Sequence, residues 1–201
     1  MHLSEGILSA PVLVSGGVLA LAGTAVGLNK IDYERIAQVG VLSSAFFVAS
    51  LVHINIGPSS VHLILNGLVG LLLGWAAFPA ILVALILQAV FFQFGGITTL
   101  GVNTVIMALP AVICYYAFTP MIRKTSATAL IAAFSCGFLS VLCSAVMLGV
   151  SLIFTEENFW EVSTLIVIAH LPVMVIEGII TVFCLIFLKK VHPAMLPGYS
   201  E

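Results

Sequence analysis

The chain has 201 residues, of which 62% are hydrophobic and 7% are charged, whereas soluble domains carry about 25% charged residues. So few charged groups cannot cover a water-exposed surface, which excludes a water-soluble globule. The net charge of −2 and the total of six Lys and Arg residues leave no basic face for nucleic acid. Because one membrane span takes about 20 residues, we expect a single all-α, polytopic membrane domain over residues 1–201.

The N-terminal segment 1–6 begins with Met1 and His2, and no basic residue occurs before Lys30. A cleavable signal peptide needs a basic region ahead of its apolar core. We therefore expect no cleavage, so that Met1 is the first residue of the mature protein and keeps its α-amine.

Seven apolar runs follow along the chain, and each predicts a helix within the membrane. The third and fourth runs are short for complete spans and carry Gly67, Gly70, Gly74 and Pro79. We expect these two helices to be broken or tilted and to line a cavity. The seven predicted helices cover residues 7–28, 36–53, 61–75, 80–94, 99–118, 127–154 and 162–188.

Charged residues in the connections predict the orientation of this bundle. With the N-terminus outside the cell, all six Lys and Arg residues fall in cytoplasmic connections, at 29–35, at 119–126 and after residue 188. The outer connections carry glutamates and no Lys or Arg. Because cytoplasmic loops are the ones enriched in basic residues, we predict an extracytoplasmic N-terminus and a cytoplasmic C-terminus.

The dipeptide formed by Met1 and His2 can chelate a metal ion. Its α-amine, the amide nitrogen of residue 2 and Nδ1 of the imidazole close two fused rings and fill three corners of a square. A second imidazole would complete a set of four nitrogens (N4), which suits Ni(II) or Cu(II). His53 and His62 fall on the same side of the predicted bundle. A histidine at a membrane interface can equally be a polar anchor, so the residues alone leave both interpretations open.

His170 and Glu177 lie seven residues apart in the last predicted helix and therefore on one face of it. An unpaired carboxylate in the centre of a membrane costs about 2.5–3.5 kcal/mol, so Glu177 should face the interior of the bundle. Two roles remain open for this pair: a proton relay or coupling element, and a hydrogen-bonded packing device.

Four motifs follow one another along the chain. They are the segment 1–6, then Gly57-Pro58-Ser59-Ser60-Val61-His62-Leu63, then Gln88 to Asn103, and finally His170-Leu171-Pro172 with Ile176-Glu177-Gly178. In these motifs the chain resembles the CbiM/NikM family, the substrate-capture (S) components of energy-coupling-factor (ECF) transporters for cobalt and nickel. The stretches around His62 and Glu177 are most similar to cobalt-type CbiM members.

The resemblance implies a metal site at the N-terminus. The α-amine of Met1, the amide and imidazole of His2 and the imidazole of His62 would hold Co(II) or Ni(II) as the transported substrate, without a prosthetic group. It also implies a place for His53, as a further ligand or beside the ligands. Three polar residues would orient the imidazoles: Gln93, Thr98 and Asn103.

The resemblance further implies a transport subunit and not an enzyme. The partners would be a membrane coupling (T) protein, cytoplasmic ATPase subunits and a small two-span accessory subunit, in a bacterial or archaeal cell membrane, with cobalt imported for cobalamin biosynthesis. The sequence contains no P-loop, which agrees with separate ATPase subunits. An alternative is a proton-coupled secondary metal carrier that uses Glu177 and His170.

Overall fold

The structure, a computed structural model, describes residues 2–51, 53–56, 59–123 and 126–197, and for residues 53–56, 59–60, 126 and 157 it describes the backbone alone. The α-helices are α1 (Ala10–Asn29), α2 (Ile36–Ala49), α3 (Asn66–Leu73), α4 (Ala77–Phe92), α5 (Leu100–Ile122), α6 (Ser126–Ile153), α7 (Trp160–Ala169) and α8 (Leu171–Val191). Two short strands, β1 (His53–Ile56) and β2 (Ser59–His62), form an antiparallel pair. Short 3-10 turns complete the chain: η1 (Tyr33–Arg35), η2 (Gly74–Ala76), η3 (Glu157–Phe159) and η4 (Pro193–Met195).

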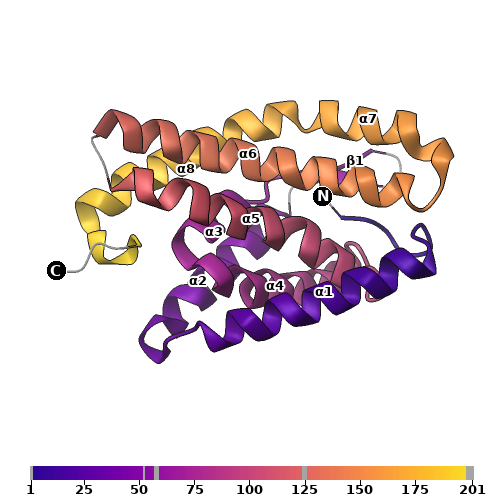
Figure 1. Ribbon diagram of the computed structural model, residues 1–201, viewed down its shortest axis with the longest axis horizontal. Helices are drawn as coiled ribbons and strands as arrows, with labels where there is room; N and C mark the ends of the chain where they lie inside the picture. Colours follow the sequence, from indigo (N-terminus) through magenta and orange to yellow (C-terminus); the bar gives the residue numbers. More distant parts are fainter. Residues whose placement is uncertain (1, 52, 57–58, 124–125, 198–201) are drawn as a thin grey trace.

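The helices form one bundle, with α6, α7 and α8 along one side, α1 and α4 along the opposite side, and α3 and α5 between them (Figure 1). Among the described residues, five helical stretches are long and apolar enough to cross a membrane, at 10–29, 66–92, 100–122, 127–153 and 160–191. Large apolar side chains such as Leu21 and Phe183 are exposed on the outside of the bundle, where lipid tails are as apolar as they are. The predicted all-α, polytopic membrane fold is confirmed.

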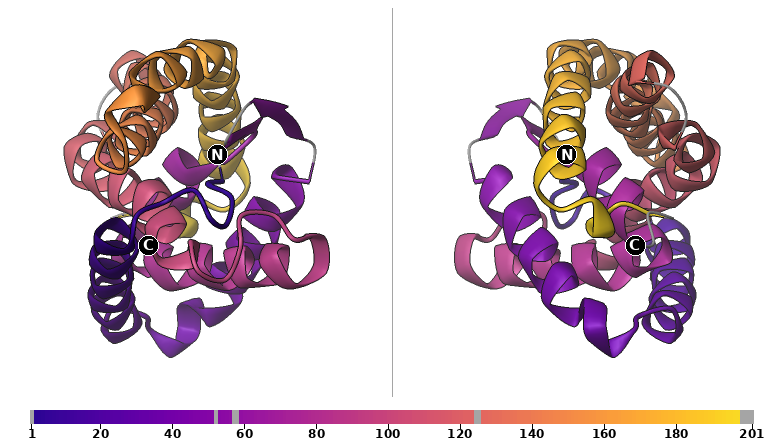
Figure 2. Two further views of the ribbon diagram at one scale, coloured as in Figure 1. Left: turned by 90° about the vertical axis from the view of Figure 1, so that its right-hand side faces the viewer. Right: turned by 90° about the vertical axis from the view of Figure 1, so that its left-hand side faces the viewer.

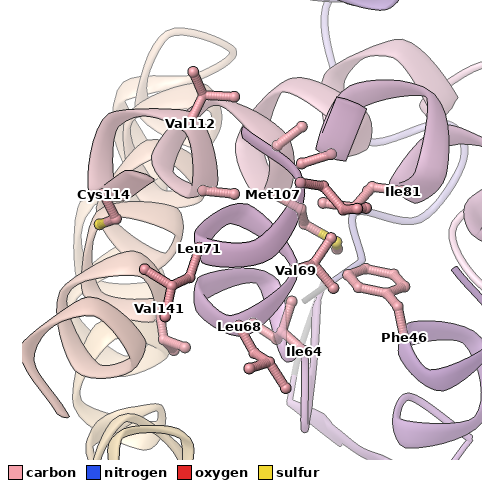
Figure 3. Packing of buried hydrophobic residues seen from close by; sticks show 14 of the residues in the cluster. Phe46, Ile64, Leu68, Val69, Leu71, Ile81, Met107, Val112, Cys114 and Val141 are labelled. Atoms are coloured by element: carbon pink, nitrogen blue, oxygen red, sulfur yellow. The ribbon is translucent and has the colours of Figure 1, made fainter. Parts of the chain in front are cut away.

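Helix α3 lies at the centre of the bundle, and every one of its residues is buried. Leu68, Val69 and Leu71 project from it in different directions into the surrounding helices (Figure 3). A helix that is apolar all round is stable only where other elements cover it on all sides. Glycine permits the close approach that this requires, because a Cβ on Gly67 would lie 2.7 Å from the Cα of Gly137 in α6. The position of α3, and of the chain entering it, is therefore set by tight packing.

The predicted helices 36–53 and 61–75 are wrong at the ends where they approach each other. Helix α2 ends at Ala49, and the chain then forms β1 and β2, with His53 paired to His62. From His53 to Ile56 the sequence alternates polar and apolar residues, and this period of two favours a strand over a helix. The hairpin places His62 directly before the turn into α3.

The predicted helix 162–188 is broken at His170 into α7 and α8. Pro172, in the first turn of α8, has no N–H group with which to continue the hydrogen bonds of α7. The expected break between the third and fourth predicted helices occurs at Gly74, whose φ of +56° suits glycine and few other residues.

The two ends of the bundle carry different side chains. At one end Lys189 Nζ donates to the carbonyl oxygen of Ile122 at 3.0 Å, and Arg123 lies nearby. At the other end Glu5 accepts the backbone N–H of Thr98, and the N-terminal segment enters the middle of the bundle (Figure 2, left). Lys189, Arg123 and Arg35 thus lie at one end of the bundle, where Asp32 and Glu34 stand beside Arg35 in the same connection, and Glu5 lies at the other end. Which end faces the cytoplasm remains a prediction.

Candidate metal centre

The N-terminal segment is held in the bundle by its own main chain. The Asn103 side chain accepts the Leu3 N–H at Oδ1 (2.9 Å) and donates from Nδ2 to the Leu3 carbonyl (3.2 Å). The Thr99 hydroxyl donates to the same carbonyl at 2.9 Å. Leu3 and the neighbouring His2 are both buried. Because both polar groups of Leu3 are satisfied, the backbone next to His2 has a fixed orientation.

The imidazoles of His2 and His62 meet inside the bundle. Nδ1 of His2 lies 3.0 Å from Nε2 of His62, and the two rings stack with their centroids 4.6 Å apart and their planes at 28°. Only 4% of His2 and 3% of His62 is exposed. The structure therefore brings together two of the side chains predicted to bind metal.

The hydrogen bond of His62 to the main chain determines which ring nitrogen carries the proton. Its Nδ1 lies 2.7 Å from the carbonyl oxygen of Leu63. A carbonyl can only accept, so Nδ1 donates, and Nε2 of the neutral ring holds a lone pair. Burial lowers the pKa of His62 well below its usual range, and the proximity of His2 lowers it further, because a charged imidazolium is poorly solvated there. In the neutral ring, Nε2 therefore holds the lone pair, 3.0 Å from Nδ1 of His2.

A chain of three hydrogen bonds determines which ring nitrogen of His2 carries the proton. The Ser50 hydroxyl donates to the Phe47 carbonyl at 2.8 Å, so its oxygen accepts from the Gln88 amide nitrogen. This orientation leaves Gln88 Oε1 facing Nε2 of His2 at 2.7 Å. Because Oε1 can only accept, Nε2 carries the proton in the neutral ring and Nδ1 holds a lone pair.

In two neutral rings, Nδ1 of His2 and Nε2 of His62 would therefore each hold a lone pair. Lone pairs at 3.0 Å repel, and a cation bound by both nitrogens relieves that repulsion. Metal–imidazole bonds of about 2.0–2.1 Å at a right angle put two nitrogens about 2.8–3.0 Å apart. The spacing therefore fits two adjacent corners of a metal coordination square.

Further donors for such a metal would have to come from the main chain or from outside the described residues. In the part of the chain that the structure describes, no three His, Cys, Asp or Glu residues form a cluster. Met1, predicted to supply its α-amine, lies outside the described residues, as does the side chain of His53. Of His53 the structure gives only the backbone, which pairs with His62 between β1 and β2.

Of the three polar residues predicted to orient the imidazoles, one lies beside the site and two are exposed. Asn103 is beside the site, where it holds the main chain of Leu3. Thr98 and Gln93 are exposed, and Thr98 contributes a backbone N–H to Glu5. Helix α4 ends before Gln93, and the buried side chain of α4 that contacts the His2 ring is that of Gln88. Gln88 has the one polar side chain in α4, and this was the signal in the sequence that could have identified it.

Glu177 is fully buried and is hydrogen-bonded to the turn that follows His62. Its Oε1 accepts the N–H groups of Ile64 at 2.5 Å and of Leu65 at 2.8 Å. His170 is also buried, and its Nδ1 lies 2.7 Å from the carbonyl oxygen of Ile166. Within the described residues, Nε2 of His170 and Oε2 of Glu177 have no hydrogen-bond partner. The two side chains predicted as a pair are thus not linked to each other by a hydrogen bond.

Comparison with known proteins identifies the family. Residues 2–195 match the family described as the cobalt uptake substrate-specific transmembrane region, CbiM. The chain belongs to the CbiM family. This family assignment confirms the resemblance seen in the sequence motifs, and it makes the protein a multi-pass membrane protein of a metal-transporter family.

Individual relatives of this CbiM-family chain support the same family assignment. A Haemophilus influenzae protein, provisionally named a metal transport protein, is 41% identical over 199 residues, covering 98% of this chain and 97% of that protein. The cobalt transport protein CbiM of Sorangium cellulosum is 28% identical over 213 residues, covering 98% and 94%. A crystal structure of a transition metal transporter has a TM-score of 0.77 at 25% identity, covering 95% of this chain and 93% of that one.

Proposed function

We propose that this CbiM-family protein is the substrate-capture subunit of an ECF-type importer for Co(II) or Ni(II). The ion would bind in an N4 set made by the α-amine of Met1, the amide nitrogen and Nδ1 of His2, and Nε2 of His62. Membership in a cobalt uptake family and relatives named for cobalt and nickel transport support the substrate class.

One observation carries the proposal: Nδ1 of His2 and Nε2 of His62 lie 3.0 Å apart inside the bundle. Of the two nitrogens of the His2 ring, Nδ1 is the one that closes a six-membered chelate ring with the amide of its own residue. It is also the one that faces His62. In this chelate the amide would be central and the fourth corner would lie next to Nδ1; His62 Nε2 lies 3.0 Å from that atom, which supports this assignment.

The charge of such a site suits transport of a divalent ion. A bare cation cannot leave water for hydrocarbon, and nitrogen ligands would replace its hydration shell. The amide must lose its proton to bind, which adds one negative charge and releases a proton on binding. At a shared N4 site the Irving–Williams order favours Ni(II) over Co(II), so Ni(II) is the sharper probe of the geometry.

Blocking the α-amine of Met1 tests this function. A single glycine added ahead of Met1 should weaken Ni(II) and Co(II) binding by more than about 100-fold in calorimetry, since losing a direct ligand should exceed the 10–100-fold cost of losing a supporting group. The matched control carries the same glycine after Glu201 and should bind as the wild type does. Equal binding by both extended proteins would refute the N4 site.

Transport in liposomes separates this function from a proton-coupled carrier. The observation in favour of that second candidate is that Nε2 of His170 and Oε2 of Glu177 are buried without a hydrogen-bond partner among the described residues. We expect the protein reconstituted alone to bind the metal without moving it under a proton gradient, and import to need the coupling protein and the ATPase subunits. Gradient-driven uptake by this chain alone, lost in His170→Ala, would favour the carrier.

A further inference from the structure

We propose that Glu177 is a positioning residue of the metal centre, which acts on the ligand His62 through the peptide unit between Leu63 and Ile64. This inference rests on the proposed function, since it concerns how the same site is held and tuned. It assigns to a carboxylate in helix α8 a defined role toward the imidazole of the last residue of β2.

One peptide unit connects the two side chains. Its carbonyl, from Leu63, lies 2.7 Å from Nδ1 of His62 and accepts that proton. Its N–H, from Ile64, donates to Oε1 of Glu177 at 2.5 Å. The carboxylate, the peptide and the imidazole therefore form one continuous line of hydrogen bonds that ends at the lone pair on Nε2.

Such a line of hydrogen bonds changes the basicity of the His62 ring and also fixes its position. Hydrogen bonds in series polarise one another, and a carboxylate that receives the N–H makes the carbonyl of the same peptide a better acceptor. Metal-binding histidines usually donate their second N–H to a carboxylate or a carbonyl, which fixes the ring and raises its basicity. Here a carboxylate reaches the ring by way of a carbonyl.

The turn itself needs a support of this kind. Leu65 has a φ of +56°, a left-handed conformation that is unfavourable for a leucine, and α3 begins directly after it with no side-chain cap. Glu177 Oε1 accepts the N–H of Leu65 as well, at 2.8 Å. The free N–H groups at the start of a helix attract a negative group, so the carboxylate both holds the strained residue and serves the start of α3.

Helix α8 is packed so that Glu177 cannot shift easily. A Cβ on Gly137 of α6 would lie 2.6 Å from the main-chain oxygen of Glu177, and one on Gly178 would lie 2.7 Å from the ring of Phe134. The Thr181 hydroxyl donates to the carbonyl of Glu177 at 2.7 Å. The close contact of α6 and α8 thus fixes the carboxylate against the turn that follows His62.

Two substitutions of Glu177 test the proposal in the purified full-length protein, with Ni(II) chloride as the probe. Glu177→Ala removes the acceptor, and Ni(II) affinity should fall about 10–100-fold. Glu177→Gln keeps a carbonyl that can accept both N–H groups but loses the negative charge, so its affinity should lie between those of the wild type and the alanine variant. The ligand-field absorption of bound Ni(II) should shift in the same order.

Ser163→Ala is the matched control. It also removes a buried polar contact from the same broken helix, a hydrogen bond from Ser163 to the Gly149 carbonyl at 3.1 Å, and it should leave affinity and absorption unchanged. If Glu177→Ala does not fold, Glu177→Gln decides the matter alone. Wild-type affinity and an unshifted spectrum in Glu177→Gln would overturn the proposal.

The outcome is separable from that of the proposed function. A wild-type protein that does not bind Ni(II), or a His62→Ala variant that binds it normally, would refute the N4 site itself. Normal binding by the wild type, loss in His62→Ala and no change in Glu177→Gln would refute only the link through the peptide.

Discussion

The two ends of the bundle satisfy their free main-chain groups in opposite ways. At the basic end, Lys189 donates to the carbonyl of Ile122 in the last turn of α5, and Arg35 donates to the carbonyl of Leu72 in the last turn of α3 at 2.8 Å. Cations are favourable near the C-terminal end of a helix, and negative groups near its N-terminal end. At the N-terminal end, α3 begins against the carboxylate of Glu177 instead.

This difference between the two ends indicates where a metal cation would bind. At the basic end the protein itself supplies the positive charges that the acceptors need. At the other end Nδ1 of His2 and Nε2 of His62 lie 3.0 Å apart, and each ring makes a hydrogen bond through its other nitrogen. Two buried ring nitrogens at this spacing suit a metal cation, so we expect substitutions to affect metal binding at this end alone.

Removing an imidazole should have the largest effect. His62→Ala and His2→Ala should each reduce Ni(II) affinity by more than about 100-fold in calorimetry, because each takes away a direct ligand. His192, exposed at the basic end, offers the matched control, and His192→Ala should bind as the wild type does. A His62→Ala variant with unchanged affinity would contradict the assignment.

Breaking the hydrogen-bond chain behind His2 should have a smaller effect. Gln88→Leu removes the acceptor of Nε2, so the ring can adopt the wrong tautomer, and Ni(II) affinity should fall about 10–100-fold. Gln38 makes its hydrogen bonds at the basic end, from Arg35 and to the Met195 carbonyl, and Gln38→Leu should leave Ni(II) affinity unchanged. Equal affinities for the two variants would show that the tautomer of His2 is set in another way.

Loosening the main chain of Leu3 should reduce Ni(II) affinity by a smaller factor than Gln88→Leu does. Asn103→Leu leaves a buried N–H without its acceptor, which costs about 1–3 kcal/mol of stability, and Ni(II) affinity should fall about tenfold. Thermal unfolding measures the loss of stability, and calorimetry on the same preparation measures Ni(II) affinity. The control is Thr104→Val in the same helix, where the hydroxyl bonds only the Leu100 carbonyl among the described contacts, and it should not change affinity.

The smallest effect is expected at the basic end. Lys189→Met removes a cation from the last carbonyls of α5 and should lower the free energy of unfolding by about 0.3–1 kcal/mol. Ni(II) affinity measured by calorimetry should stay at the wild-type value. A loss of affinity in this variant would break the proposed division between the two ends.

Several features could be predicted from the sequence because they depend on composition and on neighbours along the chain. The long helices α1, α5 and α6 follow the apolar runs 7–28, 99–118 and 127–154. The chelating chemistry of His2 likewise needs only its own residue and the α-amine before it.

Other features depend on contacts between distant residues, and sequence patterns do not report these. Whether residues 53–62 form a hairpin, and whether Gln88 or Gln93 faces an imidazole, depends on where α2 and α4 end. His2 and His62 are 60 residues apart, and Glu177 lies 113 residues after Ile64. Local preference determined the helices of this protein, and only the close packing of α3 against α5, α6 and α8 decided which polar groups meet.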